Sequence, residues 1–146
     1  KMGARMGIPQ VIVPGAMDDM IFAGEAAVPP AFRGPERLTI HHNPTVCATR
    51  LNAEELTQMG AIMTERVNES KGPTTIMLPL RGISAYDAPG AKWSDLTVEQ
   101  AMFRKVEELV SPHIRLVKLD AHINDADFAD RVVEEFLANW NRKDTQ

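Results

Sequence analysis

The centre of the chain, residues 74–90, reads TTIMLPLRGISAYDAPG. Residues 74–78 are β-branched or apolar, which is typical of a strand buried on both faces of a parallel sheet. The following residues are rich in glycine, proline and polar side chains, so we predict a strand over 74–78 and a long connection over 79–95. In an open α/β sheet such a connection lies at the carboxyl edge, where ligands bind.

Helical patterns precede and follow this strand. Asn52 and Glu55 have the spacing of a capping box and predict a helix that ends near residue 71. Thr97 and Gln100 have the same spacing and predict a helix that ends before Pro112. The core-facing residues expected on the two helices are Leu56, Met59, Ile62, Met63 and Val67, then Val98, Met102, Val106 and Leu109.

Further strands are expected over 11–13, 38–40 and 116–119. Residues 18–35 contain glycines and several prolines, and we predict mostly loop there, with one helical turn. Pro44 suits the first position of a short helix that Asn43 would cap. Asn124 would cap the last helix, whose expected apolar stripe is Phe128, Val132, Val133, Phe136, Leu137 and Trp140.

The alternation of strands and helices predicts a single α/β domain over 1–146. We expect a three-layer, doubly wound, mainly parallel sheet of flavodoxin-like or Rossmann-like type. Residues 1–5 resemble the end of a helix closed by Gly7, so we expect the fold to be incomplete at its N-terminus and completed by an upstream domain or chain. An unfinished sheet leaves an edge exposed, which also favours a homo-oligomer.

Acidic residues outnumber basic ones, 20 to 16, and the net charge is -4. That balance gives no electrostatic footprint for nucleic acid and no polybasic membrane patch. No apolar run approaches the roughly 20 residues of a membrane-spanning helix. Cys47 is the single cysteine and cannot form an internal disulfide, which favours a reducing compartment. We therefore expect a cytoplasmic protein that binds neither nucleic acid nor membranes.

Arg81 and Gly82 directly follow the central strand. The guanidinium offers a fixed fork of donors to a carboxylate or phosphate, and the glycine permits close backbone approach. The alternative is that Arg81 pairs with Asp87 and staples its own loop. The chain contains no G-x-G-x-x-G and no Walker lysine, so a dinucleotide site carried by this chain alone is not expected.

His122 follows the last predicted strand. It suits a general acid or base near neutral pH, and a hydrogen-bonded structural role is the open alternative. Ser84, Asp87 and His122 resemble a hydrolytic triad in their order only. The sequence Gly82-Ile-Ser-Ala-Tyr86 lacks the second glycine of a nucleophile elbow, which argues against a triad.

Other polar residues cluster at the predicted strand ends. Adjacent histidines on a strand point to opposite faces, so only one of His41 and His42 can join a site. No His-x-x-x-His or Cys-x-x-Cys spacing is present, and no metal site is predicted. Asn43 and Thr45 lie beside a predicted helix N-terminus, which favours anions.

Six ordered motifs together resemble the C-terminal domain of a widespread uncharacterised family that includes the tomato mosaic virus resistance protein. They span almost the whole chain and are Gly7-Ile-Pro-Gln10, Pro14-Gly-Ala-Met-Asp18, Val28-Pro-Pro-Ala-Phe-Arg33, His42-Asn-Pro-Thr45, Leu78-Pro-Leu-Arg-Gly-Ile-Ser-Ala-Tyr-Asp87 and His122-Ile-Asn-Asp125. The resemblance implies a two-domain protein, of which this chain is the later part of the second domain. It assigns ATP binding to the N-terminal domain, so ATP is expected only in the full-length family, through a domain absent from this chain.

The leading hypothesis is that the chain binds a small anionic ligand, phosphorylated ligands included, near the domain interface. Arg81 would hold the anion, and His122 and Asp87 are the candidate catalytic residues. The candidate ligand-binding residues are Asp18, His42, Asn43, Thr45, Arg81, Gly82, Ser84, Asn124 and Asp125. The rival hypothesis is a non-catalytic regulatory or protein-binding module whose crevice docks a partner domain.

Overall fold

The computed structural model describes residues 2–143, which form two three-stranded sheets and four α-helices. The helix expected at the start is confirmed over Met2–Arg5 (α1), whereas Lys1 lies outside the described residues. Gly7 follows α1 with a φ of 72°, a conformation that glycine adopts without strain.

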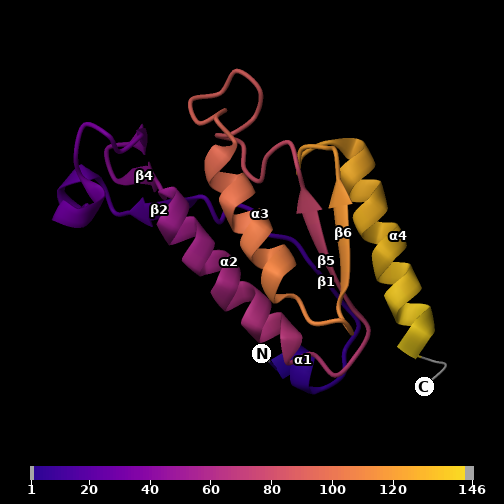
Figure 1. Ribbon diagram of the computed structural model, residues 1–146. Coiled ribbons are helices and arrows are strands. Elements are labelled where there is room, and N and C mark those ends of the chain that lie inside the picture. The colour runs from indigo at the N-terminus through magenta and orange to yellow at the C-terminus, as the bar shows by residue number, and fades with distance from the viewer. Residues whose placement is uncertain (1, 144–146) are drawn as a thin grey trace.

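A parallel sheet forms the centre of the molecule (Figure 1). Its strands, in spatial order, are β1 (Gln10–Ile12), β5 (Thr74–Pro79) and β6 (Arg115–Leu119). Ile76 of the central strand pairs with Ile12 on one side and Leu116 on the other. Every residue of β5 is buried, which confirms the strand predicted over 74–78.

Helices cover both faces of this sheet, as Figure 1 shows. On one face, α2 (Ala53–Asn68) and α3 (Thr97–Leu109) pack against Ile76 and Leu78. On the other face, Phe128 of α4 (Ala126–Lys143) packs against Met77. Successive residues of β5 therefore point to opposite helical layers, and the α/β class is confirmed.

The region before α2 differs from the prediction. It forms a separate antiparallel sheet in the order β2 (Asp19–Phe22), β4 (Val46–Arg50), β3 (Thr39–Asn43). The loop predicted over 18–35 is therefore wrong at β2, and the strand predicted over 38–40 lies outside the parallel sheet. Two 3-10 turns, Glu25–Ala27 and Pro30–Phe32, follow β2.

The short helix predicted from Pro44 is also wrong. The side chain of Asn43 accepts hydrogen bonds from the backbone N and the hydroxyl of Thr45, both at 2.9 Å. This local arrangement makes a tight turn at Pro44, and the chain returns as β4 instead of starting a helix.

The helix caps are partly as predicted. The capping box of Asn52 and Glu55 is confirmed, with both reciprocal hydrogen bonds at 2.9 Å. The box predicted at Thr97 is wrong, because the backbone N of Thr97 donates to the Asp95 side chain and α3 starts after Leu96 without a side-chain cap. At α4, Asp125 and not Asn124 immediately precedes the helix.

Two of the predicted apolar stripes are only partly buried. Met59 and Ile62 of α2 are 40% and 43% exposed. On α4, Phe128 is buried, but the outer face is exposed at Val133, Phe136, Leu137 and Trp140. These four side chains remain 40–57% exposed in the described part of the chain, and Val133 and Phe136 border a pocket beside β1.

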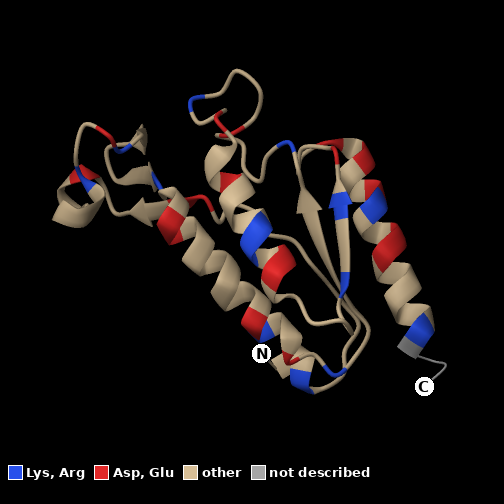
Figure 2. Cartoon of the chain, viewed as in Figure 1, with Lys and Arg blue, Asp and Glu red and all other residues tan. Residues whose placement is uncertain are grey.

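No described helix is both long and apolar enough to cross a bilayer. Acidic and basic residues are mixed along α3 and α4 (Figure 2), so neither helix carries a stripe of one sign.

Candidate functional site

The loops that follow β1, β5 and β6 meet at the carboxyl edge of the parallel sheet. The backbone N of Ala16 donates to the carbonyl of Ile83 at 2.9 Å. The backbone N of Ile123 donates to Gly82 at 3.0 Å, and that of Arg81 donates to Ala121 at 3.0 Å. The structure thus brings together three of the segments in which sequence analysis placed its candidate residues.

His122 and Asp87 lie in contact beneath this edge. The imidazole Nε2 is 3.2 Å from Asp87 Oδ1 and 2.9 Å from the carbonyl oxygen of Ser84. The backbone N of Asn124 donates to Nδ1 at 3.1 Å, which requires Nδ1 to be unprotonated. His122 is therefore a neutral imidazole that donates through Nε2, and both of its nitrogens are occupied within the protein.

Asp87 also holds its own loop. Its two carboxylate oxygens accept hydrogen bonds from the backbone N of Ile83 at 2.6 Å and of Ser84 at 3.1 Å. Gly82 leaves the room that this arrangement needs, because a Cβ there would lie 2.6 Å from both Asp87 Oδ1 and His122 Cδ2. Gly82 has a φ of 131°, which other residues rarely adopt. Its role here is to permit the contact between Asp87 and His122.

Ser84 connects this pair to Asp18. Its hydroxyl donates to Asp18 Oδ2 at 2.6 Å and accepts from the backbone N of Tyr86 at 3.1 Å. His122 contacts the backbone carbonyl of Ser84 and not its hydroxyl, so the arrangement is not a Ser-His-Asp triad. Asp18 is fully buried, and burial raises the pKa of its carboxyl more than the Ser84 hydrogen bond lowers it.

Three other candidates lie on the outside of the site. Arg81 is 58% exposed, and its Nε is 3.9 Å from Asp120, so it does not staple Asp87. Asn124 and Asp125 are exposed, and the carboxylate of Asp125 accepts from the backbone N of His122 at 2.8 Å.

The antiparallel sheet reaches the site through His42. Its Nε2 is hydrogen-bonded to the hydroxyl of Tyr86, and the ring of Tyr86 packs edge-on against Trp93 with centroids 4.8 Å apart. His41 instead lines a separate pocket of about 310 Å³, so only one of the two adjacent histidines joins the site. Asn43 and Thr45 bond to each other in the exposed hairpin turn.

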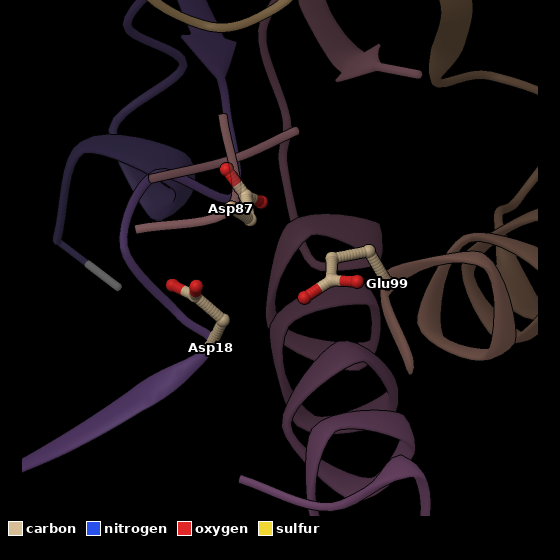
Figure 3. Close-up of side chains that lie close together, drawn as sticks. All are labelled: Asp18, Asp87 and Glu99. Atoms are coloured by element: carbon tan, nitrogen blue, oxygen red, sulfur yellow. The ribbon is translucent and has the colours of Figure 1, made fainter. Parts of the chain in front are cut away.

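Arg50 and Glu99 form a buried pair that was not predicted from the sequence. Arg50 Nη2 donates to both oxygens of Glu99, at 2.8 and 3.0 Å, and both side chains are buried. Burial raises the pKa of Glu99, and the Arg50 hydrogen bond lowers it by less. Glu99 lies in the first turn of α3, where an acidic residue is usual, so its position in the sequence gave no signal. Figure 3 shows Asp18, Asp87 and Glu99 around a common space.

The family model and the similar proteins point to the same family. Residues 1–140 match the uncharacterised protein family (UPF0261) C-terminal domain. The chain is 34% identical over 133 residues to a UPF0261 protein of Clostridium tetani, covering 90% of this chain and 32% of that protein. It is 35% identical over 136 residues to a UPF0261 protein of Mesorhizobium japonicum, covering 92% and 34%.

A plant relative is also similar. The ToMV resistance protein Tm-1(GCR237) of Solanum lycopersicum is 34% identical over 132 residues, covering 89% of this chain and 17% of that protein. The chain spans about a third of the length of the bacterial relatives named above. By its match over almost the whole sequence, the chain belongs to the UPF0261 C-terminal domain family.

Proposed function

We propose that this domain binds a small anionic ligand at the carboxyl edge of its parallel sheet, with Arg81 holding the anion. The observation that carries the proposal is the position of Arg81 on the three converging loops. Its side chain is 58% exposed, and among the described residues its one ion pair is a long contact, 3.9 Å, with the highly exposed Asp120. An arginine fork in that state can make paired hydrogen bonds to a phosphate or carboxylate.

The backbone around Arg81 supports a ligand site. Ala16, whose backbone N is bonded to the same loop, has a φ of 51°, the only positive φ of a non-glycine residue among those described. Residues held in this region often belong to functional sites. Asn124 is exposed on the neighbouring loop and is a further candidate to orient the ligand. His42, which is hydrogen-bonded to Tyr86, is another candidate, together with Asn43 and Thr45 from the same hairpin.

The interior of the site favours binding over catalysis. His122 and Asp87 are the catalytic candidates, but every polar atom of the imidazole already has a partner. Turnover by His122 requires a ligand group to take the place of one of these partners. In the observed arrangement, the pair holds the loops in the shape that presents Arg81.

Isothermal titration calorimetry of the intact protein with inorganic phosphate and pyrophosphate tests the proposal. Arg81→Ala should weaken binding at least about tenfold, since a charge-assisted hydrogen bond contributes roughly 1.5–3 kcal/mol. Arg104→Ala is the matched control, because Arg104 is exposed on α3. Equal affinity of the wild type and Arg81→Ala would refute the proposal, as would failure of both probes to bind. A native mass spectrum of the purified protein would identify any ligand that it retains.

The second candidate function is a docking module for upstream chain. A pocket of about 460 Å³ lies between β1 and α4, lined by residues 9–12 with Val132, Val133 and Phe136. β1 is an edge of the described sheet, and the bacterial relatives are about three times as long as this chain. We infer that upstream residues of the longer protein add strands beside β1 and complete a doubly wound, flavodoxin-like or Rossmann-like sheet.

Hydrogen exchange tests this docking. The amides of β1 and the centre of α4 should exchange more slowly in the full-length protein than in this domain alone. Phe136→Ser should remove the difference, whereas the exposed α2 substitution Ile62→Ser should preserve it. Protection that depends on concentration in the isolated domain would show a homo-oligomer on this face instead. Equal exchange in both proteins would exclude docking by upstream chain.

A further inference from the structure

Three carboxylates from distant parts of the sequence meet in the interior. Asp18 precedes β2, Asp87 lies in the loop after β5, and Glu99 lies on α3, as Figure 3 shows. One oxygen from each lies within 4.8 Å of the others. The three residues are 0%, 1% and 0% exposed, respectively, so water does not screen their repulsion.

The charges around this cluster do not balance. Arg50 neutralises one carboxylate through its contact with Glu99. His122 adds no positive charge, because its Nδ1 accepts a backbone hydrogen bond. With the three carboxylates ionised and Arg50 the only cation paired with them among the described residues, the cluster carries a charge of about -2.

Asp18 supplies a second, independent indication. Its Oδ2 accepts from Ser84, but its Oδ1 is buried and has no hydrogen-bond partner among the described residues. Buried carboxylate oxygens are normally paired, and an unpaired one indicates an absent ligand or proton. This oxygen belongs to one of the three clustered carboxylates, so the unpaired position lies within the cluster itself.

We propose that Asp18, Asp87 and Glu99 form a binding site for a divalent cation with oxygen ligands. Such an ion would remove the excess charge and coordinate the unpaired oxygen. Calcium suits such a site better than magnesium, because calcium accepts carboxylate oxygens in a flexible geometry, whereas magnesium requires a near-ideal octahedron. Calcium takes six to eight ligands, so water or backbone oxygens complete its shell. The proposal is independent of anion binding by Arg81.

Calorimetry of the intact protein tests the site with calcium, magnesium and manganese chlorides, after removal of metals with EDTA. The wild type should bind one calcium ion, and its melting temperature should rise by roughly 8 °C at a hundred times the dissociation constant. Asp18→Asn keeps the shape of the side chain and should weaken binding at least about tenfold. Asp130→Asn, an exposed change on α4, should have no effect.

Two outcomes would overturn the proposal. The first is a wild type that binds no divalent cation, which would leave protons to neutralise the cluster. The second is cation binding that Asp18→Asn leaves unchanged, which would place the ion elsewhere. If Asp18→Asn does not fold, Glu99→Gln provides the second variant. Equilibrium dialysis of the wild type against calcium chloride requires no substitution, and no retained ion there would also overturn the site.

Discussion

Replacing His122 by alanine should destabilise the protein substantially. The imidazole is 8% exposed and donates to the carbonyl of Ser84 and the carboxylate of Asp87. Its removal leaves both acceptors short of a donor, at about 1–3 kcal/mol for each buried group. Asp87 keeps two backbone hydrogen bonds, so the destabilisation from its missing donor should be at the low end of this range. The backbone N of Asn124 is on an exposed residue and can bond to water.

The expected total is about 3 kcal/mol, or roughly 10 °C in melting temperature for a domain of this size. Urea denaturation of the intact protein followed by circular dichroism gives the free energy of unfolding directly. His113→Ala is the matched control, since His113 is exposed, and it should change stability by less than about 0.5 kcal/mol. Equal stability of His122→Ala and wild type would refute the structural role and favour a histidine reserved for chemistry.

Three further predictions concern the loops and the buried carboxylate. Gly82→Ala should lower the free energy of unfolding by about 3 kcal/mol or more, because of the positive φ and the close contacts of the added Cβ. Gly90 has a φ of 80° and no neighbour within 4 Å, so Gly90→Ala should lower it by only about 1–2 kcal/mol. Equal losses of stability in thermal melts would refute the steric argument. Asn43→Ala should cost about 1 kcal/mol and speed amide exchange in β4, and unchanged exchange would show that the hairpin does not depend on this side chain. Burial raises the pKa of Asp18 in the folded state, so the folded chain holds a proton that the unfolded chain releases, and stability falls as pH rises from the unfolded to the folded pKa. In EDTA, Asp18→Asn should therefore gain stability relative to wild type as pH rises through that window, and parallel profiles would contradict this assignment.

The parts of the fold that sequence predicts well carry their signals locally. The continuous apolar run of β5 and the capping box of Asn52 and Glu55 lie within a few residues of the elements they specify. Asn43-Pro44-Thr45 is different, because the same residues suit a helix start and a hairpin turn. Pairing between β3 and β4 decides between the two, and that pairing is a tertiary interaction that local propensity does not contain.

The candidate site shows the same division. Residues that follow strands could be placed together, because the ends of parallel strands share one edge of the sheet. Arg50 and Glu99 are 49 positions apart, and Arg50 is the last residue of β4, a strand that was not predicted. In the sequence, each of the two residues looks like an ordinary charged residue on the surface. Their buried ion pair could be identified only from the positions of both chain segments in the structure.

The residues at this edge divide into two groups by burial, and the division determines how substitutions should be interpreted. His122, Asp87, Ser84 and Asp18 are buried and bonded in a series, so a change in any one is transmitted to the loops that carry the others. The side chain of Arg81 is exposed, and its ion pair among the described residues is with the exposed Asp120, so its substitution leaves those loops in place. Loss of ligand binding after a change in the buried group therefore identifies a loop-positioning role unless stability is unchanged, whereas the same loss after Arg81→Ala identifies a direct contact.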